Sequence, residues 1–226
     1  MTKDDLEQLD KPCPTCGDQL IDCACGTFPK IQPPPVSMMY DGPANEWESN
    51  GKEFLGYFKD ICNLKPNERM LDVGSGLGRK TIPLTDYLTE GSYEGIDCKE
   101  LGVRWCRENI TTVYPNFKFR HINVYAPGYN TEGRIAQQDL RFPFEDNEFD
   151  FVFLGSVFTH MLYMDICHYM KEIHRVLKPG GRCFITWFLL HLNRPNTMFP
   201  YEYGDNYRIA DKDFPEQAIA FFTDKV

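Results

Sequence analysis

The chain has 226 residues, 42% of them hydrophobic, which is enough for one ordinary domain with a packed core and a small appendage. Its formal net charge of −9, from 24 basic and 33 acidic residues, argues against nucleic acid as a partner, because the phosphate backbone would be repelled. No apolar run approaches the roughly 20 residues that a membrane-spanning helix needs, and the acidic start of the chain is unlike a signal peptide. We therefore expect a cytoplasmic protein with no membrane partner.

The first distinctive segment is a cysteine cluster, spaced C-x2-C and C-x-C with six residues between the two pairs. Thiolates this close, with Gly17 after the first pair and Gly26 after the second, suit one tetrahedral zinc ion. The gap between the pairs is shorter than in zinc ribbons, so an iron–sulfur cluster and a leader that binds no metal are the alternatives. We expect a structural zinc knuckle because the site would use all four of its cysteines, Cys13, Cys16, Cys23 and Cys25.

A proline-rich spacer, residues 29–36, follows the cysteines and cannot form a regular helix or a central strand. It divides the chain into a cysteine-rich segment with its linker, residues 1–36, and a second domain, residues 37–226. Near the start of this domain apolar residues recur at helical spacing, which predicts an amphipathic helix over 47–62.

Residues 69–80, RMLDVGSGLGRK, predict a buried strand that ends in a glycine-rich turn and continues into a helix over 77–88. Glycines in the turn allow tight backbone conformations and leave no side chain between the backbone and a ligand. Ligands of open α/β sheets bind beyond the carboxyl ends of the strands, so this turn is the first candidate site. Its candidate ligand-binding residues are Asp72, Gly74, Ser75, Gly76 and Gly78.

The spacing of the glycines narrows the choice of ligand. A dinucleotide-binding turn needs a third small residue where Arg79 stands, which argues against a nicotinamide-dependent reductase, and the G-K-S or G-K-T of a P-loop is absent. The remaining pattern, D-x-G-x-G-x-G, resembles that of class I S-adenosylmethionine-dependent methyltransferases. The resemblance implies S-adenosylmethionine as the cofactor and a leading helix over its cleft. Tyr40 and Trp47 stand near that helix. For both we expect core packing, and contact with cofactor or substrate is the alternative.

A second strand, YEGID, ends at Asp97, 25 residues after Asp72. This interval is close to the ~20 residues expected between a glycine turn and an acid that binds ribose, so we assign Asp97 to the ribose hydroxyls. An N-cap of the following helix, predicted over 99–113, is compatible with that role. Cys98 is a further candidate for contact with the cofactor, whereas the other cysteines outside the cluster are expected to be reduced core residues.

Residues 117–124 predict a third strand, and a long loop with glycine and proline follows it. The methyltransferase resemblance implies that an acidic residue here binds the adenine amino group while the next backbone N–H meets a ring nitrogen. Asp139 and Leu140 fit, since they stand ahead of RFPFEDNEFD, which is similar to the family's L-P-F-x-D-x-x-F-D motif. Asn123 is the competing candidate for the adenine.

An almost unbroken apolar run predicts a fourth strand over 149–154, buried on both faces. Gly155 and Ser156 follow at its carboxyl end, where the resemblance implies that the methionine part of the cofactor passes and the acceptor pocket begins. His160 is the candidate general base, because imidazole can accept a hydroxyl proton at neutral pH. A capping or positioning role is its alternative. A helix is predicted next, over 163–177.

The L-K-P-G-G motif at 177–181 precedes a fifth strand and is another mark of the resembled family. Beyond this strand, His191 is a second candidate base. The family continues with a helix and an antiparallel hairpin, which are not recognisable before the chain ends at Val226. We therefore expect the sheet to be truncated, with an exposed edge, or to be completed in another way.

Together these elements predict an α/β fold: a doubly wound, mostly parallel sheet with helices on both faces, beside a small metal-binding knuckle. The resemblance implies methyl transfer from S-adenosylmethionine, and the negative charge and aromatic tail favour a small or sugar-like hydroxyl acceptor. We therefore expect an O-methyltransferase that acts on a small molecule. A binding or scaffold module, in which the knuckle recruits a partner, is the alternative.

Overall fold

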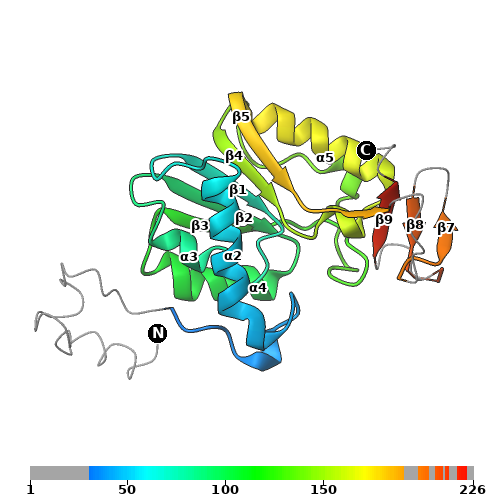
Figure 1. The fold of residues 1–226 in the computed structure, drawn as a ribbon, viewed down its shortest axis with the longest axis horizontal. Coiled ribbons are helices and arrows are strands. Elements are labelled where there is room, and N and C mark those ends of the chain that lie inside the picture. Colours follow the sequence, from blue (N-terminus) through cyan, green and yellow to red (C-terminus); the bar gives the residue numbers. More distant parts are fainter. Residues whose placement is uncertain (1–30, 191–197, 204–206, 211, 214–217, 223–226) are drawn as a thin grey trace, which may run out of the picture.

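The computed structural model describes residues 31–190, 198–203, 207–210, 212–213 and 218–222 (Figure 1). The predicted zinc ligands and the second candidate base lie outside these residues; they are Cys13, Cys16, Cys23, Cys25 and His191. The zinc knuckle therefore stays a prediction. Within the described ranges, no helix is long and apolar enough to cross a bilayer.

The centre of the domain is a sheet of five strands: β1 Arg69–Val73, β2 Ser92–Asp97, β3 Phe117–His121, β4 Phe149–Leu154 and β5 Leu177–Ile185. All pairings are parallel, and the order is β3-β2-β1-β4-β5 (Figure 1). The chain builds outward from β1 to β3 and then returns to the other side of β1, so the sheet is doubly wound as predicted. The switch of direction falls between β1 and β4, where a ligand crevice is expected.

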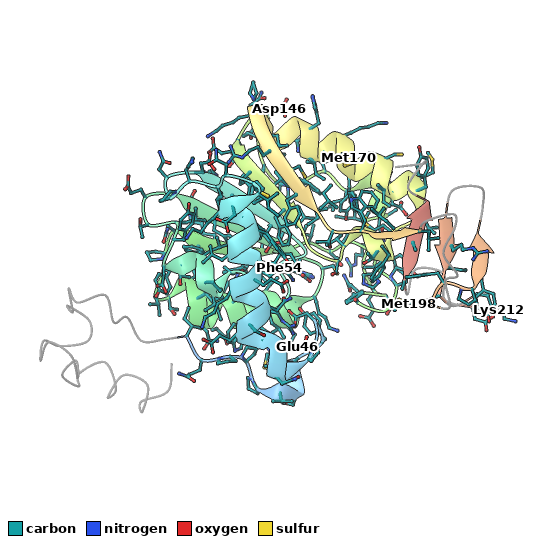
Figure 2. The ribbon with its side chains drawn as sticks, in the orientation of Figure 1. Glu46, Phe54, Asp146, Met170, Met198 and Lys212 are labelled. Carbon is teal, nitrogen blue, oxygen red and sulfur yellow. The ribbon has the colours of Figure 1, made fainter. Side chains whose placement is uncertain are left out.

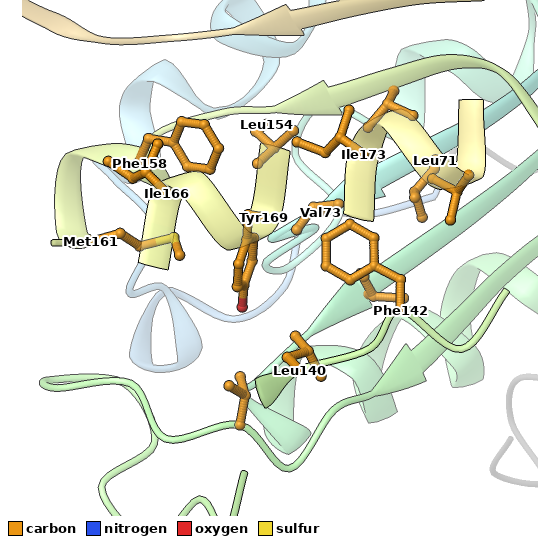
Figure 3. Packing of buried hydrophobic residues seen from close by; sticks show 14 of the residues in the cluster. Leu71, Val73, Leu140, Phe142, Leu154, Phe158, Met161, Ile166, Tyr169 and Ile173 are labelled. Atoms are coloured by element: carbon orange, nitrogen blue, oxygen red, sulfur yellow. The ribbon is translucent and has the colours of Figure 1, made fainter. Parts of the chain in front are cut away.

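Helices cover both faces of this sheet: α2 Trp47–Asp60, α3 Ile82–Thr85, α4 Glu100–Cys106 and α5 Tyr163–Val176. Leu71 and Val73 of β1 belong to one hydrophobic cluster with α5 (Figure 3). Met70 belongs to a second cluster with α2, α3 and α4. Because neighbouring strand residues face opposite sides, strands buried on both faces are nearly continuous apolar runs, as the sequence indicated.

Aromatic packing holds α2 on the sheet. Phe54, labelled on α2 in Figure 2, has its ring centroid 5.5 Å from that of Phe153 on β4. Phe58, one turn later, lies 4.8 Å from the same ring. The helix predicted over 47–62 is thereby confirmed, although it ends at Asp60. The position of α2 in turn places the residues before this helix against the glycine-rich turn.

The helix predicted over 77–88 is wrong in length, because regular helix is confined to α3. Gly76 and Gly78 have φ angles of 56° and 78°, a conformation that a right-handed helix does not include. The glycine turn therefore extends further than its sequence pattern indicated. The helix predicted over 99–113 is confirmed, with a π-helical segment, Arg107–Thr111, after α4.

The L-K-P-G-G motif also differs from its expected form as a turn before the strand. β5 begins directly after α5, at Leu177, and contains the motif. Its pairing with β4 shifts in register, from Phe149 opposite Leu177 to Phe151 opposite Arg182. The residues between them form a bulge, in which Gly180 has a φ of 78°.

The tail forms a second sheet from β6 Phe188–Leu190, β7 Tyr201–Tyr203, β8 Tyr207–Ile209 and β9 Ile219–Phe222, beyond the end of β5 (Figure 1). β8 pairs antiparallel with β7 and with β9, so antiparallel strands are present that the sequence pattern did not reveal. Strands this short give too few residues for a period of two to be recognised. Among the described residues β5 pairs only with β4, so the outer edge of the main sheet has no partner strand there.

Candidate active site

A cavity of about 390 Å³ lies at the carboxyl ends of β1, β2 and β4, at the predicted switch point. This volume is in the range of small-ligand sites. The loop after β3 and the stretch before α2, which includes Tyr40, complete its walls. The predicted site residues that line the cavity are Asp72, Gly74, Ser75, Gly76, Asp97, Cys98, Gly155, Ser156 and His160.

The glycine-rich turn is hydrogen-bonded to β2, and side chains from other segments pack closely against it. The N–H of Gly74 donates to the carbonyl of Ile96 at 2.7 Å. A Cβ added at Gly76 would lie 2.8 Å from Asp41 Oδ2, so this position has room only for glycine. Gly78 does not line the cavity, and a Cβ there would lie 2.7 Å from a side chain of the π-helical segment. Its role is therefore close packing rather than ligand contact.

Asp97 connects the turn to β2 through backbone hydrogen bonds. Its Oδ2 accepts from the N–H of Gly76 at 2.8 Å, and its Oδ1 accepts from the N–H of Lys99 at 2.7 Å. Burial raises the pKa of this carboxyl, and the two N–H donors oppose that shift. Asp97 therefore orders the turn and also lines the cavity. The neighbouring Cys98 stays a protonated thiol, because burial raises its pKa to about 12.

Asp72 is buried at the end of β1 and is only half satisfied. Its Oδ2 accepts from the hydroxyl of Tyr93 at 2.7 Å, and that hydroxyl also contacts the Thr81 hydroxyl at 2.8 Å. Burial raises the pKa of Asp72 to about 6. Its Oδ1 is enclosed and has no hydrogen-bond partner in the part of the chain that the structure describes.

Other residues of the cavity also have buried polar atoms without a hydrogen-bond partner in the described part of the chain. Buried polar atoms nearly always have hydrogen-bond partners in folded proteins, so a group of them without partners around one cavity indicates a polar ligand. Counting only the described residues, the buried atoms of cavity residues that have no partner are Tyr40 Oη, Asp72 Oδ1, Ser75 Oγ, Arg79 Nε and Gln137 Oε1.

The stretch before α2 contributes residues that the sequence did not assign to the site. Asp41 pairs with Arg79 at 3.3 Å and accepts from the N–H of Leu77 at 3.4 Å. The guanidinium carbon of Arg79 lies 5.0 Å from the ring centroid of Trp47, which is buried in the core as expected. Tyr40, for which core packing was expected and ligand contact was the alternative, lines the cavity. No local pattern could have indicated these contacts, because they join segments 38 residues apart.

On the other side of the cavity, the loop after β3 meets the residues that follow β4. The hydroxyl of Tyr129 lies 3.2 Å from Nε2 of His160. Ser156 has a φ of 60°, an uncommon conformation for a residue with a side chain, and its N–H donates to Thr186 Oγ1 at 2.7 Å. Val157 joins them in the cavity wall, so this side combines one imidazole with apolar surface.

The predicted adenine contacts occupy different positions from those expected. Asp139 ends the short 3-10 helix Gln137–Asp139 and is exposed, and neither it nor Leu140 lines the cavity. Leu140 is buried in the hydrophobic core. Asn123 is exposed and outside the cavity as well. Gln137, two residues before Asp139, occupies the wall in their place.

Comparison with known proteins gives one family match, described as "Methyltransferase domain", over residues 71–185. Curated relatives include a demethylmenaquinone methyltransferase of Bacillus cereus (strain ATCC 10987 / NRS 248), 29% identical over 123 residues, which cover 54% of this chain and 45% of that protein. A demethylmenaquinone methyltransferase of Geobacillus stearothermophilus is 30% identical over 135 residues, 58% of this chain and 50% of that protein. The chain thus spans about half the length of these relatives.

Solved structures with a similar fold include a SAM-dependent methyltransferase from Aquifex aeolicus. It has a TM-score of 0.48 and 22% sequence identity, and the match covers 69% of this chain and 73% of that one. The PH0226 protein from Pyrococcus horikoshii OT3 has a TM-score of 0.49 and 22% identity, over 63% of this chain and 58% of that one.

Proposed function

The chain belongs to the methyltransferase domain family, and on that basis we propose that it transfers a methyl group from S-adenosylmethionine to a hydroxylated small molecule, with His160 as the proton acceptor. The family match includes the glycine-rich turn, Asp97 and the strand before His160. It ends at Ile185, within the main sheet, so the tail is not part of it.

The observation that carries the proposal is the order of the polar side chains along the cavity. Gln137 comes from the loop after β3, Asp97 ends the neighbouring strand β2, and Asp72 lies on β1, the strand on the other side of β2. S-adenosylmethionine carries an adenine, a ribose and an amino acid group in the same sequence. An amide oxygen suits the adenine amino group, a carboxylate suits a ribose diol, and a second carboxylate suits an ammonium group.

The chemistry required of the protein is limited. Bound S-adenosylmethionine supplies a methyl group that its sulfonium charge has already activated. The chain's own residues have to orient the acceptor, exclude water and accept a proton. His160 lies in the cavity wall beyond Gly155 and Ser156, where its imidazole can accept a hydroxyl proton.

The acceptor side of the cavity suits a ring better than an open polar chain. Val157, Met161 and Tyr169 provide apolar surface beside His160. A phenol methylated on oxygen gives up its hydroxyl proton. A quinol methylated on the adjacent ring carbon is first activated by loss of a hydroxyl proton, and it then loses the ring C–H proton to solvent while its oxygen is reprotonated and the ring becomes aromatic again. Both reactions therefore begin with the same proton acceptor. The names of the relatives favour the quinol as the second candidate acceptor.

The experiment is incubation of the full chain with S-adenosylmethionine that carries an isotope-labelled methyl group, together with a sugar, a simple catechol or a demethylated naphthoquinol. We expect label in an aromatic product, and its position on oxygen or carbon distinguishes the two acceptors. If the chain binds S-adenosylhomocysteine yet labels none of the three, the scaffold alternative is favoured. If it binds no S-adenosylhomocysteine, the proposal fails.

A further inference from the structure

Lys80, the second residue after the glycine-rich turn, is a cation without an anion. It lines the cavity, yet within the described part of the chain its Nζ has no hydrogen-bond or ion-pair partner. The Nζ atom instead lies over the face of the Phe54 ring, 5.0 Å from its centroid. Burial lowers the pKa of this ammonium group, while the nearby charge of Asp72 opposes the shift.

Arg79, the other basic residue in the glycine-rich segment, already has an anionic partner, although its Nε has no hydrogen-bond partner among the described residues. It pairs with Asp41 at 3.3 Å and stacks over Trp47, and its side chain is only 4% exposed. Arg79 therefore holds the stretch before α2 on the turn. Lys80 forms no ion pair within the described residues, so the desolvation of its charge is offset only in part, by the nearby charges of Asp72 and Asp41.

The position of Lys80 indicates which kind of anion would pair with its ammonium group. Its Cε lies close to Gly155 at the end of β4, and its charge interacts with Asp72 at the end of β1. Asp72 Oδ1 is an acceptor without a partner. The cavity thus contains an ammonium donor without an ion pair and, within range of its charge, a carboxylate oxygen without a donor, and these are complementary to the two charges of an α-amino acid.

We propose that Lys80 binds the carboxylate of the methionine part of S-adenosylmethionine, and thereby separates the intact cofactor from adenosine thioethers that lack the amino acid end. This inference rests on the proposed function. The alternative is that Lys80 binds an anionic acceptor molecule. In that case the affinity for S-adenosylhomocysteine would not depend on Lys80.

The test is titration calorimetry of the full chain with two ligands, S-adenosylhomocysteine and 5′-methylthioadenosine, which differ in the amino acid end. Loss of one charge-assisted hydrogen bond predicts that Lys80→Met binds S-adenosylhomocysteine about 10- to 100-fold more weakly. Binding of 5′-methylthioadenosine is expected to change less than about twofold, and Lys80→Arg is expected to regain most of the loss. Lys118→Met is the matched control, because Lys118 is an exposed lysine on β3.

Each other outcome counts against the proposal. Equal losses for both ligands, or no loss for either, would overturn it. A Lys80→Met protein that unfolds at lower temperature than the wild type without ligand would also overturn it, because a cation without a partner contributes no stability. If wild-type protein binds neither ligand, the proposed function itself has failed, and that result is distinct from a change in selectivity.

Discussion

The phenol oxygen of Tyr129 lies 3.2 Å from Nε2 of His160, and the two rings meet edge to face with centroids 5.2 Å apart. Tyr129 belongs to the long loop after β3, whereas His160 ends the 3-10 helix Phe158–His160 after β4. The contact joins residues 31 positions apart across the cavity wall. It fixes one nitrogen of the candidate base, so the loop takes part in positioning His160.

Tyr129→Phe tests this positioning. The ring remains, but the hydrogen bond to His160 is lost. Partial burial raises the pKa of Tyr129, so the phenol is protonated near neutral pH and acts as a hydrogen-bonding group rather than as a base. Since such a bond contributes on the order of 1 kcal/mol, we expect kcat to fall roughly fivefold. Affinity for S-adenosylhomocysteine should stay within about twofold, and a parallel loss of that affinity would assign Tyr129 to the cofactor instead.

His160→Gln tests the base itself. General base catalysis contributes about 10²- to 10⁴-fold, so we expect kcat to fall by at least about 100-fold at neutral pH while S-adenosylhomocysteine still binds. With a phenolic acceptor, the residual rate should rise with pH, because the acceptor then ionises without help from the protein. A variant that retains wild-type kcat across the pH range would exclude His160 as the base.

Gln137 and Asp139 provide a comparison at the adenine end. Gln137 lines the cavity and its Oε1 has no partner among the described residues, whereas Asp139 is exposed. We expect Gln137→Ala to weaken S-adenosylhomocysteine binding roughly fivefold, the value of one ordinary hydrogen bond. Asp139→Ala should change it by less than about twofold. The reverse order would restore the adenine assignment made from the sequence motif.

Asp72 predicts an unusual dependence of stability on pH. A carboxyl group whose pKa is raised to about 6 by burial binds its proton more tightly in the folded state than in the unfolded state. Its contribution to stability is therefore present at low pH and is lost as the pH rises through about 6. Asp72→Asn retains an oxygen acceptor for Tyr93 and has no charge to bury.

Urea unfolding of the ligand-free chain and of Asp72→Asn, across the same pH series, measures this contribution. The free energy of unfolding of the variant, relative to the wild type, should increase by on the order of 2–3 kcal/mol between about pH 4 and pH 7. If this difference in the free energy of unfolding stays constant or decreases with pH, burial does not raise the pKa of Asp72. The variant should bind S-adenosylhomocysteine more weakly even though it is more stable.

The sequence alone was sufficient for features that depend on short stretches of chain. Apolar runs identified β1 and β4, and the interval from the glycine turn placed Asp97 at the end of the neighbouring strand. Both succeed because a parallel sheet brings the carboxyl ends of its strands to one edge.

Features that depend on contacts between distant segments could not be predicted in this way. The pairing of Asp41 with Arg79 and the contact of Tyr129 with His160 arise only when the stretch before α2 and the loop after β3 pack around the cavity. The adenine contact stays a prediction, but the residues chosen for it, Asp139 and Leu140, do not line the cavity, and the reason is related. A motif specifies where a loop ends, but the path of a long loop decides which of its side chains reaches the cavity, here Gln137.

The central claim, that the cavity holds S-adenosylmethionine, is tested most directly by titration calorimetry of S-adenosylhomocysteine into wild-type protein and Asp97→Ala. Asp97 lines the cavity and accepts hydrogen bonds from Gly76 and Lys99, so its removal takes away a carboxylate and loosens the turn together. The account predicts saturable binding at one site by the wild type and a loss of about 100-fold or more in the variant. No binding by the wild type, or identical binding by the two proteins, would contradict it.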